Sequence, residues 1–541
     1  MVSSAPRRLV LIGLDGCEWS LINPWIAEKR LPNLGKIKDN GVHAGMLSTI
    51  PSITAPALAS FMTGLKPATT GITGFIGRGG GLISFKDIQN PCIWDYLGTA
   101  GIRSLVVGLR LTYPPREIDG IMVSGGLLRA QGDDYVLPKG YLEKVRGYHP
   151  EKDTHPQMFL TMTKGVVGDA EKLTDELLAL TARQFEVFNT LSAEENFPFS
   201  LLYIENTDFA QHFLWHRPDL LLKLYELVDK AIGEVMDKNP GADFMVMSDH
   251  GFHPAPKAVF HVNKWLEQAG FLTEARINPI KTVLRSLKRN VKKTFWDPLP
   301  QLTKRNVKSY LARPRPSGIN AIENAPSFTQ PLGQAAVRIG FDPQNTSVCA
   351  VEPWGVRINL PENSSRRAAI KNEIMELMRS LTDTEGRRVF KVLRDGELER
   401  GSGPVNSAPD ILFTVSEQYR VDVGLGGAVF EPHHGGESIT GSHDQAETGV
   451  MMAYGRSAPQ GLTLPEFPIA DFLPTILEYF GLNPPDNIDG VSRARQVFPG
   501  ALGQGDLKKA EAKAYADDGA GAYKEDEEAQ IIERLKSLGY M

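Results

Sequence analysis

The sequence predicts an α/β protein with a doubly wound, mostly parallel sheet that is flanked by helices. Five short apolar runs have the length and composition of buried strands, at residues 9–12, 104–107, 199–204, 244–247 and 450–454. Longer segments have the apolar spacing of helices, at residues 173–190, 220–238 and 366–381. Strands that alternate with helices along the chain are typical of a parallel sheet with helices on both faces.

A basic segment interrupts this alternation. Residues 276–315 contain twelve Lys or Arg and a single acid, Asp297, and a Pro-rich stretch follows. We therefore expect an insertion here rather than an element of the core. The predicted parts are a first part of the core, a basic insertion or cap, a second part of the core and a tail with a terminal helix, at residues 8–270, 271–350, 351–490 and 491–541.

Composition excludes several classes of protein. The 541 residues are 42% hydrophobic and 23% charged, which is ordinary for a globular protein, and the net charge of −5 gives no reason to expect nucleic-acid binding. The three cysteines are far apart and form no CxxC pair, so neither a disulfide framework nor a thiolate metal site is indicated. The sequence shows no secretory or membrane-spanning stretch, and we expect a cytoplasmic protein.

Acidic residues follow three of the predicted strands. Asp15 ends the first run, Asp208 follows the third with His212 four residues later, and Asp249 and His250 follow the fourth. In an open α/β sheet such residues meet beyond the carboxyl ends of the strands. Carboxylates that are crowded together repel unless cations neutralise them, so these residues predict a metal site. Each motif alone has a plainer explanation, as a turn or a solvated helix face, and only their combination favours metal.

Thr54 is the candidate nucleophile. It stands where the cap of a helix is expected, with Pro56 early in that helix and Gly64 at its end. A capped core helix would have the same pattern. However, a helix amino terminus also favours a bound phosphate and an alkoxide, and a neighbouring metal ion would activate the hydroxyl further.

Together these motifs resemble the alkaline phosphatase superfamily, in its type I phosphodiesterase/nucleotide pyrophosphatase branch. The similarity is greatest to predicted phosphohydrolase and phosphomutase-like proteins. The segments that carry the resemblance occur in the family's order, at residues 13–16, 54–64, 207–212, 248–252 and 441–443. The resemblance implies an alkaline phosphatase-like fold and a phosphothreonine intermediate on Thr54.

The resemblance also implies a division of metal ligands. One ion would be held by Asp15, Thr54, Asp249 and His250, and a second by Asp208, His212 and His443. His443 is preferred over the nearby His433 and His434 because of its Gly-Ser-His context. Two divalent ions, with Zn²⁺ favoured and Mn²⁺ or Fe²⁺ as alternatives, would suit such oxygen and nitrogen ligands.

Two departures from related families narrow the function. Position 54 is Thr and no Cys-x-Pro-x-Arg motif follows, which argues against a sulfatase. The stretch 70–78 lacks the Asn that contacts phosphate in nucleotide pyrophosphatases, and Arg78 at its end is a candidate phosphate-binding residue with an ordinary exposed loop arginine as the alternative.

The basic insertion has two interpretations. Apolar residues recur at helical spacing through residues 280–293, with Lys and Arg between them. Such a helix can lie on an anionic membrane surface, or its apolar stripe can pack on the parent domain as a lid, which we favour. In either position its positive charge would attract anionic substrates.

The sequence therefore predicts a metal-dependent phosphohydrolase that acts on a small-molecule or lipid-linked phosphate ester, with a phosphodiester favoured. A phosphomonoesterase and a phosphoryl transferase or mutase of the same superfamily are the nearest alternatives. A non-catalytic scaffold that binds anionic lipid through residues 280–293 is an alternative of a different class.

Overall fold

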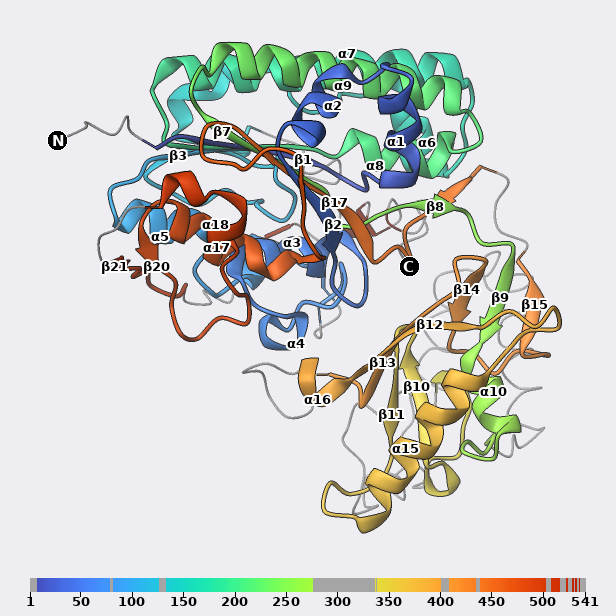
Figure 1. Ribbon diagram of the computed structural model, residues 1–541. Helices are drawn as coiled ribbons and strands as arrows, with labels where there is room; N and C mark the ends of the chain where they lie inside the picture. The colour runs from blue at the N-terminus through green and yellow to red at the C-terminus, as the bar shows by residue number, and fades with distance from the viewer. Residues whose placement is uncertain are drawn as a thin grey trace, which may run out of the picture.

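The computed structural model describes two domains (Figure 1). The larger is built on a wide sheet with helices above and below it, and the smaller lies to one side, around a four-stranded sheet. The residues described are 7–77, 81–125, 133–275, 336, 338–399, 408–433, 438–502, 507–515, 522–523, 528–529, 531–532 and 535.

The large sheet has ten strands, in the order β18-β2-β17-β7-β1-β6-β3-β4-β5, with β19 paired to β2. They are β1 Leu9–Leu14, β2 Val42–Leu47, β3 Ser104–Val107, β4 Gly120–Val123, β5 Val136–Leu137, β6 Phe199–Ile204, β7 Asp243–Met247, β17 Thr448–Tyr454, β18 Leu462–Thr463 and β19 Phe467–Pro468. The neighbours β7, β1, β6, β3 and β4 are all parallel. This confirms the predicted fold class.

One predicted strand has the wrong direction. We expected residues 450–454 to be parallel to their neighbours, but β17 runs antiparallel to both β2 and β7. The chain returns to the sheet here from the smaller domain and enters at the opposite end. Apolar content identified the strand but carries no information about its direction.

Helices cover both faces of the large sheet (Figure 1). Along β1, Val10, Ile12 and Leu14 belong to one buried cluster and Leu9 and Leu11 to the other, because successive side chains point to opposite faces. The first cluster packs under α1 Trp19–Ala27, α2 Pro32–Asp39, α6 Pro156–Lys164, α7 Ala170–Glu194, α8 Asn206–Leu214 and α9 Pro218–Lys238. The second packs against α3 Thr54–Thr63, α5 Ile93–Thr99, α17 Phe472–Tyr479 and α18 Ala494–Val497. The short helix α4 Pro67–Thr70 contacts α3.

The smaller domain has its own apolar core. Its antiparallel sheet has the order β10-β11-β13-β12, and a second sheet has the order β14-β9-β15. These elements are β9 Ala258–His261, α10 Val262–Gln268, β10 Val348–Glu352, β11 Gly355–Ile358, α15 Ser365–Ser380, β12 Phe390–Asp395, α16 Gly396–Glu399, β13 Ile411–Val415, β14 Tyr419–Asp422 and β15 Phe430–Pro432. The sequence analysis assigned residues 351–490 to the main core. In the structure, the helices and strands of this range from β11 to β15 belong to the smaller domain instead.

The remaining regular elements are short. They are β8 His253–Pro254, β16 Gly441–Ser442, β20 Leu482–Asn483, β21 Lys508–Lys509 and the 3₁₀ turns Phe85–Asp87, Lys139–Val145, Pro343–Asn345, Ile469–Asp471 and Pro499–Ala501. In the tail, Ile531 and Leu535 are buried in the core, and the Glu528 carboxylate accepts a hydrogen bond from the Leu82 amide at 2.8 Å.

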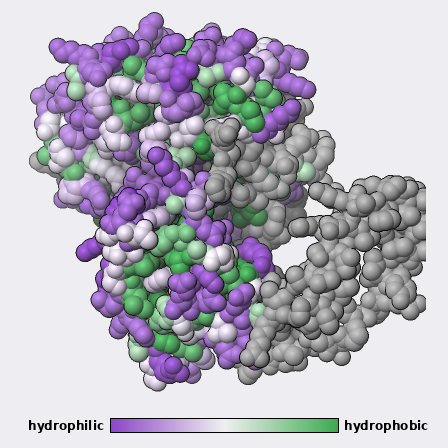
Figure 2. Space-filling model, turned by 90° about the vertical axis from the view of Figure 1, so that its right-hand side faces the viewer, coloured by the Kyte–Doolittle hydropathy of each residue, from purple (hydrophilic) through white to green (hydrophobic). Residues whose placement is uncertain are grey.

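The distribution of hydrophilic residues on the surface is consistent with this layered arrangement. Figure 2 shows mainly hydrophilic residues along the outer rim of the helices and a mixture of hydrophilic and hydrophobic residues on the smaller domain. Among the described residues, no helix combines the length and the apolar character that crossing a membrane requires. The basic stretch 280–293 and Arg78 lie outside the described residues.

Candidate metal centre

The side chains singled out from the sequence meet at one edge of the large sheet. Asp15 follows β1, Asp208 and His212 lie on the helix after β6, and Asp249 and His250 follow β7. Thr54 begins α3 and His443 follows β16. All seven residues are buried, and each is at most 4% exposed. The rule that functional residues gather beyond the carboxyl ends of parallel strands therefore located this cluster.

One half of the cluster surrounds His250. Its Nε2 lies 3.5 Å from Asp15 Oδ1, 3.3 Å from Asp249 Oδ2 and 3.2 Å from Thr54 Oγ1. Thr54 is the first residue of α3, and the residue before it occupies the cap position without a side-chain hydrogen bond. The prediction that Thr54 caps this helix is thus off by one residue, but its hydroxyl does lie at the helix amino terminus. Gly64 ends the helix, as predicted, and its backbone is in the left-handed conformation.

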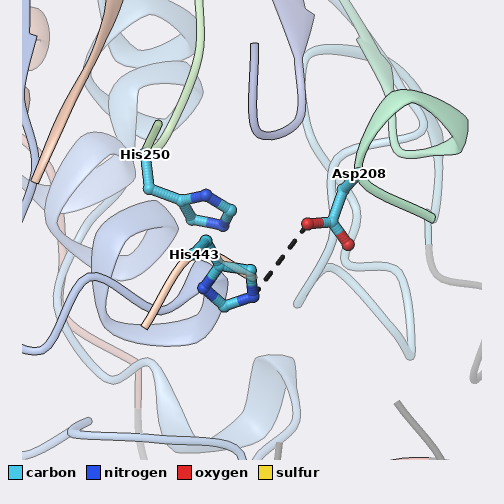
Figure 3. A group of neighbouring side chains, drawn as sticks. All are labelled: Asp208, His250 and His443. Carbon is cyan, nitrogen blue, oxygen red and sulfur yellow. Dashed lines mark ion pairs between the residues drawn. The ribbon is translucent and has the colours of Figure 1, made fainter. Parts of the chain in front are cut away.

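The other half surrounds Asp208. Its Oδ1 lies 3.5 Å from His212 Nε2 and 4.0 Å from His443 Nε2. Figure 3 shows Asp208 facing His443, with the ring of His250 stacked on that of His443. His433 lies elsewhere, directly after β15, where its amide donates to the Lys257 carbonyl. The structure thus brings His443, and not His433, to the cluster.

The three histidines are oriented in the same way. Nδ1 lies 3.2 Å from the Gly441 carbonyl in His212, 3.0 Å from the Gly251 carbonyl in His250 and 3.0 Å from the Ser52 carbonyl in His443. A carbonyl oxygen only accepts hydrogen bonds, so Nδ1 carries the proton and Nε2 presents a lone pair to the carboxylates. Lone pairs that face buried carboxylate oxygens repel unless a cation lies between them.

Two groups of ligand atoms are compact enough to hold an ion. The atoms of Asp15, Asp249 and His250 all lie within 4.8 Å of one another, as do those of Asp208, His250 and His443. In addition, Asp15 Oδ1 and Asp249 Oδ2 are buried and accept no hydrogen bond within the part of the chain that the structure describes. Buried polar atoms need such partners, so the donor set fits divalent ions.

The cluster also perturbs its own titration. Burial raises the pKa of Asp15 well above its usual range, and the charges of Asp249 and Asp208 raise it further. Burial lowers the pKa of His212, and it lowers the pKa of His443 strongly, with help from the neighbouring His250. These directions describe a site that carries too much negative charge for its dry surroundings and in which the imidazoles of His212 and His443 stay neutral.

The sequence analysis missed two charged residues of the cluster. Arg110, in the loop after β3, places Nη1 3.3 Å from Asp15 Oδ2 and 4.0 Å from Asp208 Oδ2. Its Nε lies 3.6 Å from Glu205 Oε2, and both Arg110 and Glu205 are at most 5% exposed. A signal was present, because Arg110 follows a predicted strand in the same way as the acids. The sequence analysis considered only acids and histidines at strand ends, and of the two acids that follow β6 it gave a role to Asp208 and none to Glu205.

An aromatic wall supports the second half of the cluster. The Phe252 ring meets His212 edge-on at 4.9 Å between centroids and His443 at 5.8 Å. Trp215 stacks on the other side of Phe252 at 5.5 Å. This packing limits the rotation of both imidazoles and keeps water away from them.

A match to a known protein family agrees with the geometry of the cluster. A family model described as type I phosphodiesterase / nucleotide pyrophosphatase matches residues 9–320. Similar solved structures include phosphonoacetate hydrolase from Sinorhizobium meliloti 1021 in complexes with phosphonoformate and with phosphonoacetate. Each has 18% identity and a TM-score of 0.49, and the match covers 86% of this chain and 94% of that chain. The search of curated proteins found no match. The chain belongs to the type I phosphodiesterase/nucleotide pyrophosphatase family of phosphoric ester hydrolases.

Proposed function

We propose that this protein hydrolyses phosphodiesters, with Thr54 as nucleophile and two divalent metal ions as cofactors. The observation that carries the proposal is the shared orientation of the three histidines, whose Nε2 atoms face buried carboxylates next to the Thr54 hydroxyl. Bound cations would remove the repulsion between these nitrogen lone pairs and the carboxylate oxygens. The family match supports phosphoric ester hydrolysis as the reaction class.

The residues present suit two ion sites. Asp15, Thr54, Asp249 and His250 would hold one ion, and Asp208, His212 and His443 the other. Zn²⁺ fits this mixture of oxygen and nitrogen ligands, with Mn²⁺ or Fe²⁺ as alternatives. When bound, such ions polarise phosphoryl oxygens and lower the pKa of hydroxyl groups that they contact.

The reaction proceeds in two displacements on Thr54. In the first, Oγ1 attacks phosphorus, the Oγ1–P bond forms, the bond from phosphorus to the leaving oxygen breaks, and the Thr54 proton is lost to solvent. His250 Nε2 lies 3.2 Å from Oγ1 and would bind the same ion as that oxygen, which keeps Oγ1 in place for the attack. In the second, water attacks phosphorus, the Oγ1–P bond breaks, and Thr54 regains a proton. The first amides of α3 lie at the positive end of its dipole and favour the phosphoryl oxygens in both steps.

The substrate class needs a direct test. A phosphomonoesterase and a phosphoryl transferase or mutase would use the same first step and differ in the substrate or in the acceptor of the second. We propose a small-molecule or lipid-linked diester as substrate, and the cytoplasmic location stays a prediction from the sequence.

The test compares two model substrates after metal removal. Metal-stripped protein is assayed with bis-p-nitrophenyl phosphate and p-nitrophenyl phosphate, with Zn²⁺ or Mn²⁺ added back singly. The proposal predicts turnover only with metal and a higher kcat/KM for the diester. Metal-dependent turnover that favours the monoester would replace the diesterase by a phosphomonoesterase. Folded, metal-loaded protein that hydrolyses neither compound would contradict hydrolysis and favour a transferase.

A further inference from the structure

Arg110 is built into the metal cluster rather than placed at its surface. The residue is 5% exposed, and its guanidinium group reaches the carboxylates of Asp15, Asp208 and Glu205 at 3.3, 4.0 and 3.6 Å. One nitrogen, Nη1, faces a proposed ligand of each ion site. An arginine stays protonated in proteins, so this position holds a permanent positive charge.

The loop that carries Arg110 has a defined and costly conformation. Leu111 has a φ of +64°, in the left-handed region that side chains rarely adopt. The loop is fixed on both sides, because the Gly125 amide donates to the Leu109 carbonyl at 3.1 Å and the Ser124 hydroxyl donates to the Thr112 carbonyl at 2.5 Å. Strained backbone that is held by such contacts is concentrated at functional sites, where it fixes the direction of a side chain.

The surroundings leave Arg110 little freedom to withdraw. The Phe75 ring lies 5.3 Å from its guanidinium carbon and is itself 8% exposed, which covers the charge with an aromatic face. At Gly108, two residues before, a Cβ atom would stand 2.0 Å from the Tyr148 hydroxyl and 2.6 Å from the Tyr203 carbonyl. The chain therefore packs closely at the base of this loop.

The balance of charge in the cluster explains why a cation is placed here. Asp15, Glu205, Asp208 and Asp249 are each at most 3% exposed, and four carboxylates in dry surroundings would be costly without positive charge. Glu205 differs from the other three, because it is not among the proposed metal ligands. It lies on the Nε side of Arg110 and fixes the guanidinium group against the cluster.

We infer that Arg110 is a resident counter-cation: it stabilises the carboxylates of both ion sites while they lack metal, and by the same charge it weakens the binding of divalent ions. The inference rests on the ion sites of the proposed function. Like charges a few ångströms apart at a largely buried site repel strongly enough to change a binding constant by more than tenfold. Arg110 thus makes the metal-free site tolerable and the bound metal easier to exchange.

Manganese affinity tests the inference without any assay of activity. Metal-stripped wild type, Arg110→Met, Arg110→Lys and the double variant Arg110→Met with Glu205→Gln are titrated with Mn²⁺ by calorimetry. Thermal unfolding is recorded with and without Mn²⁺. Arg110→Met removes the charge but keeps an apolar chain of similar length, Arg110→Lys keeps the charge, and the double variant removes both members of the pair.

We expect Arg110→Met to bind Mn²⁺ at least tenfold more tightly than wild type, although its metal-free form has a lower Tm. Saturating Mn²⁺ should remove most of that Tm deficit. Arg110→Lys should bind within about threefold of wild type, and the double variant should bind severalfold more tightly than wild type. If Arg110→Met does not fold without metal, the double variant decides the question, because it also removes the buried charge of Glu205 that Arg110 faces.

Equal or weaker Mn²⁺ binding by folded Arg110→Met and by the double variant would overturn the inference, since Arg110 would then orient Asp15 and Asp208 for metal rather than oppose it. The proposed function fails in a different way. If wild type binds no Mn²⁺ or Zn²⁺, the ion sites themselves are wrong. If all variants follow the expected order of affinity but no diester is hydrolysed, the inference stands and the reaction does not.

Discussion

Thr414→Val should destabilise the protein by removing a buried hydrogen bond between its two domains. Thr414 lies on β13 of the smaller domain and is 2% exposed. Its hydroxyl donates a hydrogen bond to the carboxylate of Glu447, which is 4% exposed and lies just before β17 of the large sheet. Valine has the same shape without the donor, so the variant leaves a buried carboxylate oxygen without this partner.

The size of the effect follows from this geometry. A hydrogen bond to a charged group contributes roughly 1.5–3 kcal/mol, and an acceptor left buried costs a similar amount. The Arg394 guanidinium, 3.8 Å from the other carboxylate oxygen, is too distant to replace the lost bond. We therefore expect the free energy of unfolding to fall by about 2 kcal/mol.

The same substitution should reach the metal site. His443 and Glu447 lie on one short segment, whose Ala446 amide donates to the His443 carbonyl and whose Ala446 carbonyl accepts from the Gly251 amide. Gln445 on this segment also accepts a hydrogen bond from the Val415 amide at 2.8 Å. Loss of the Thr414 bond removes one of the hydrogen bonds that hold this segment in place, so zinc affinity should fall severalfold.

The assay is urea unfolding followed by circular dichroism, together with zinc titration of the folded protein. Thr414→Ser is the matched control, because it keeps the hydroxyl and loses only a methyl group, at a cost of about 1 kcal/mol. Thr414→Val with wild-type stability and zinc affinity would refute the reasoning, since Glu447 would then gain nothing from its neighbour.

Three further predictions concern the smaller domain and the second ion site. Asn263→Ala should lower the free energy of unfolding by about 3 kcal/mol, measured by urea unfolding, because the fully buried amide makes three hydrogen bonds of 2.7–2.8 Å to backbone groups in β10 and just after β14. Burial acts to raise the pKa of Asp383, but hydrogen bonds from Arg387 and Tyr419 have the larger effect and hold this pKa well below its usual range. The stability that this carboxylate contributes is then present above about pH 4 and lost as pH falls through the lowered pKa, so the Tm of Asp383→Asn should lie below that of wild type at pH 7 and approach it in acid. His443→Asn should reduce the zinc bound per chain, measured by atomic absorption, while the control His433→Asn leaves it unchanged; equal loss in both would contradict the assignment.

The sequence predicted where the site lies better than it predicted which residues form the site. Asp15, Asp208 and Asp249 each follow a strand, and the geometry of parallel sheets places such residues together whatever the rest of the fold. His443 was preferred for its Gly-Ser-His context and the family resemblance, because strand-end geometry says nothing about a residue whose position depends on a chain that leaves the large sheet and returns. Arg110 was missed because an arginine at a strand end is usually exposed.

The fold was predictable where strands are buried on both faces. The continuous apolar runs of β1, β6 and β7 have few alternative structures. The smaller domain was not recognised, since its short strands and its one long helix show the same alternation as the large domain. The direction of β17 depends on a long-range connection that no local pattern encodes.

The rate of diester hydrolysis by Thr54→Ala tests the central claim most directly. Metal-saturated wild type, Thr54→Ser and Thr54→Ala are compared with bis-p-nitrophenyl phosphate, and zinc content is measured on the same samples. The account predicts that the serine variant keeps measurable turnover and that the alanine variant loses it by about a thousandfold or more, because no other group can form the covalent intermediate. Turnover at the wild-type rate in folded, zinc-loaded Thr54→Ala would contradict the account, since water would then attack phosphorus without Thr54.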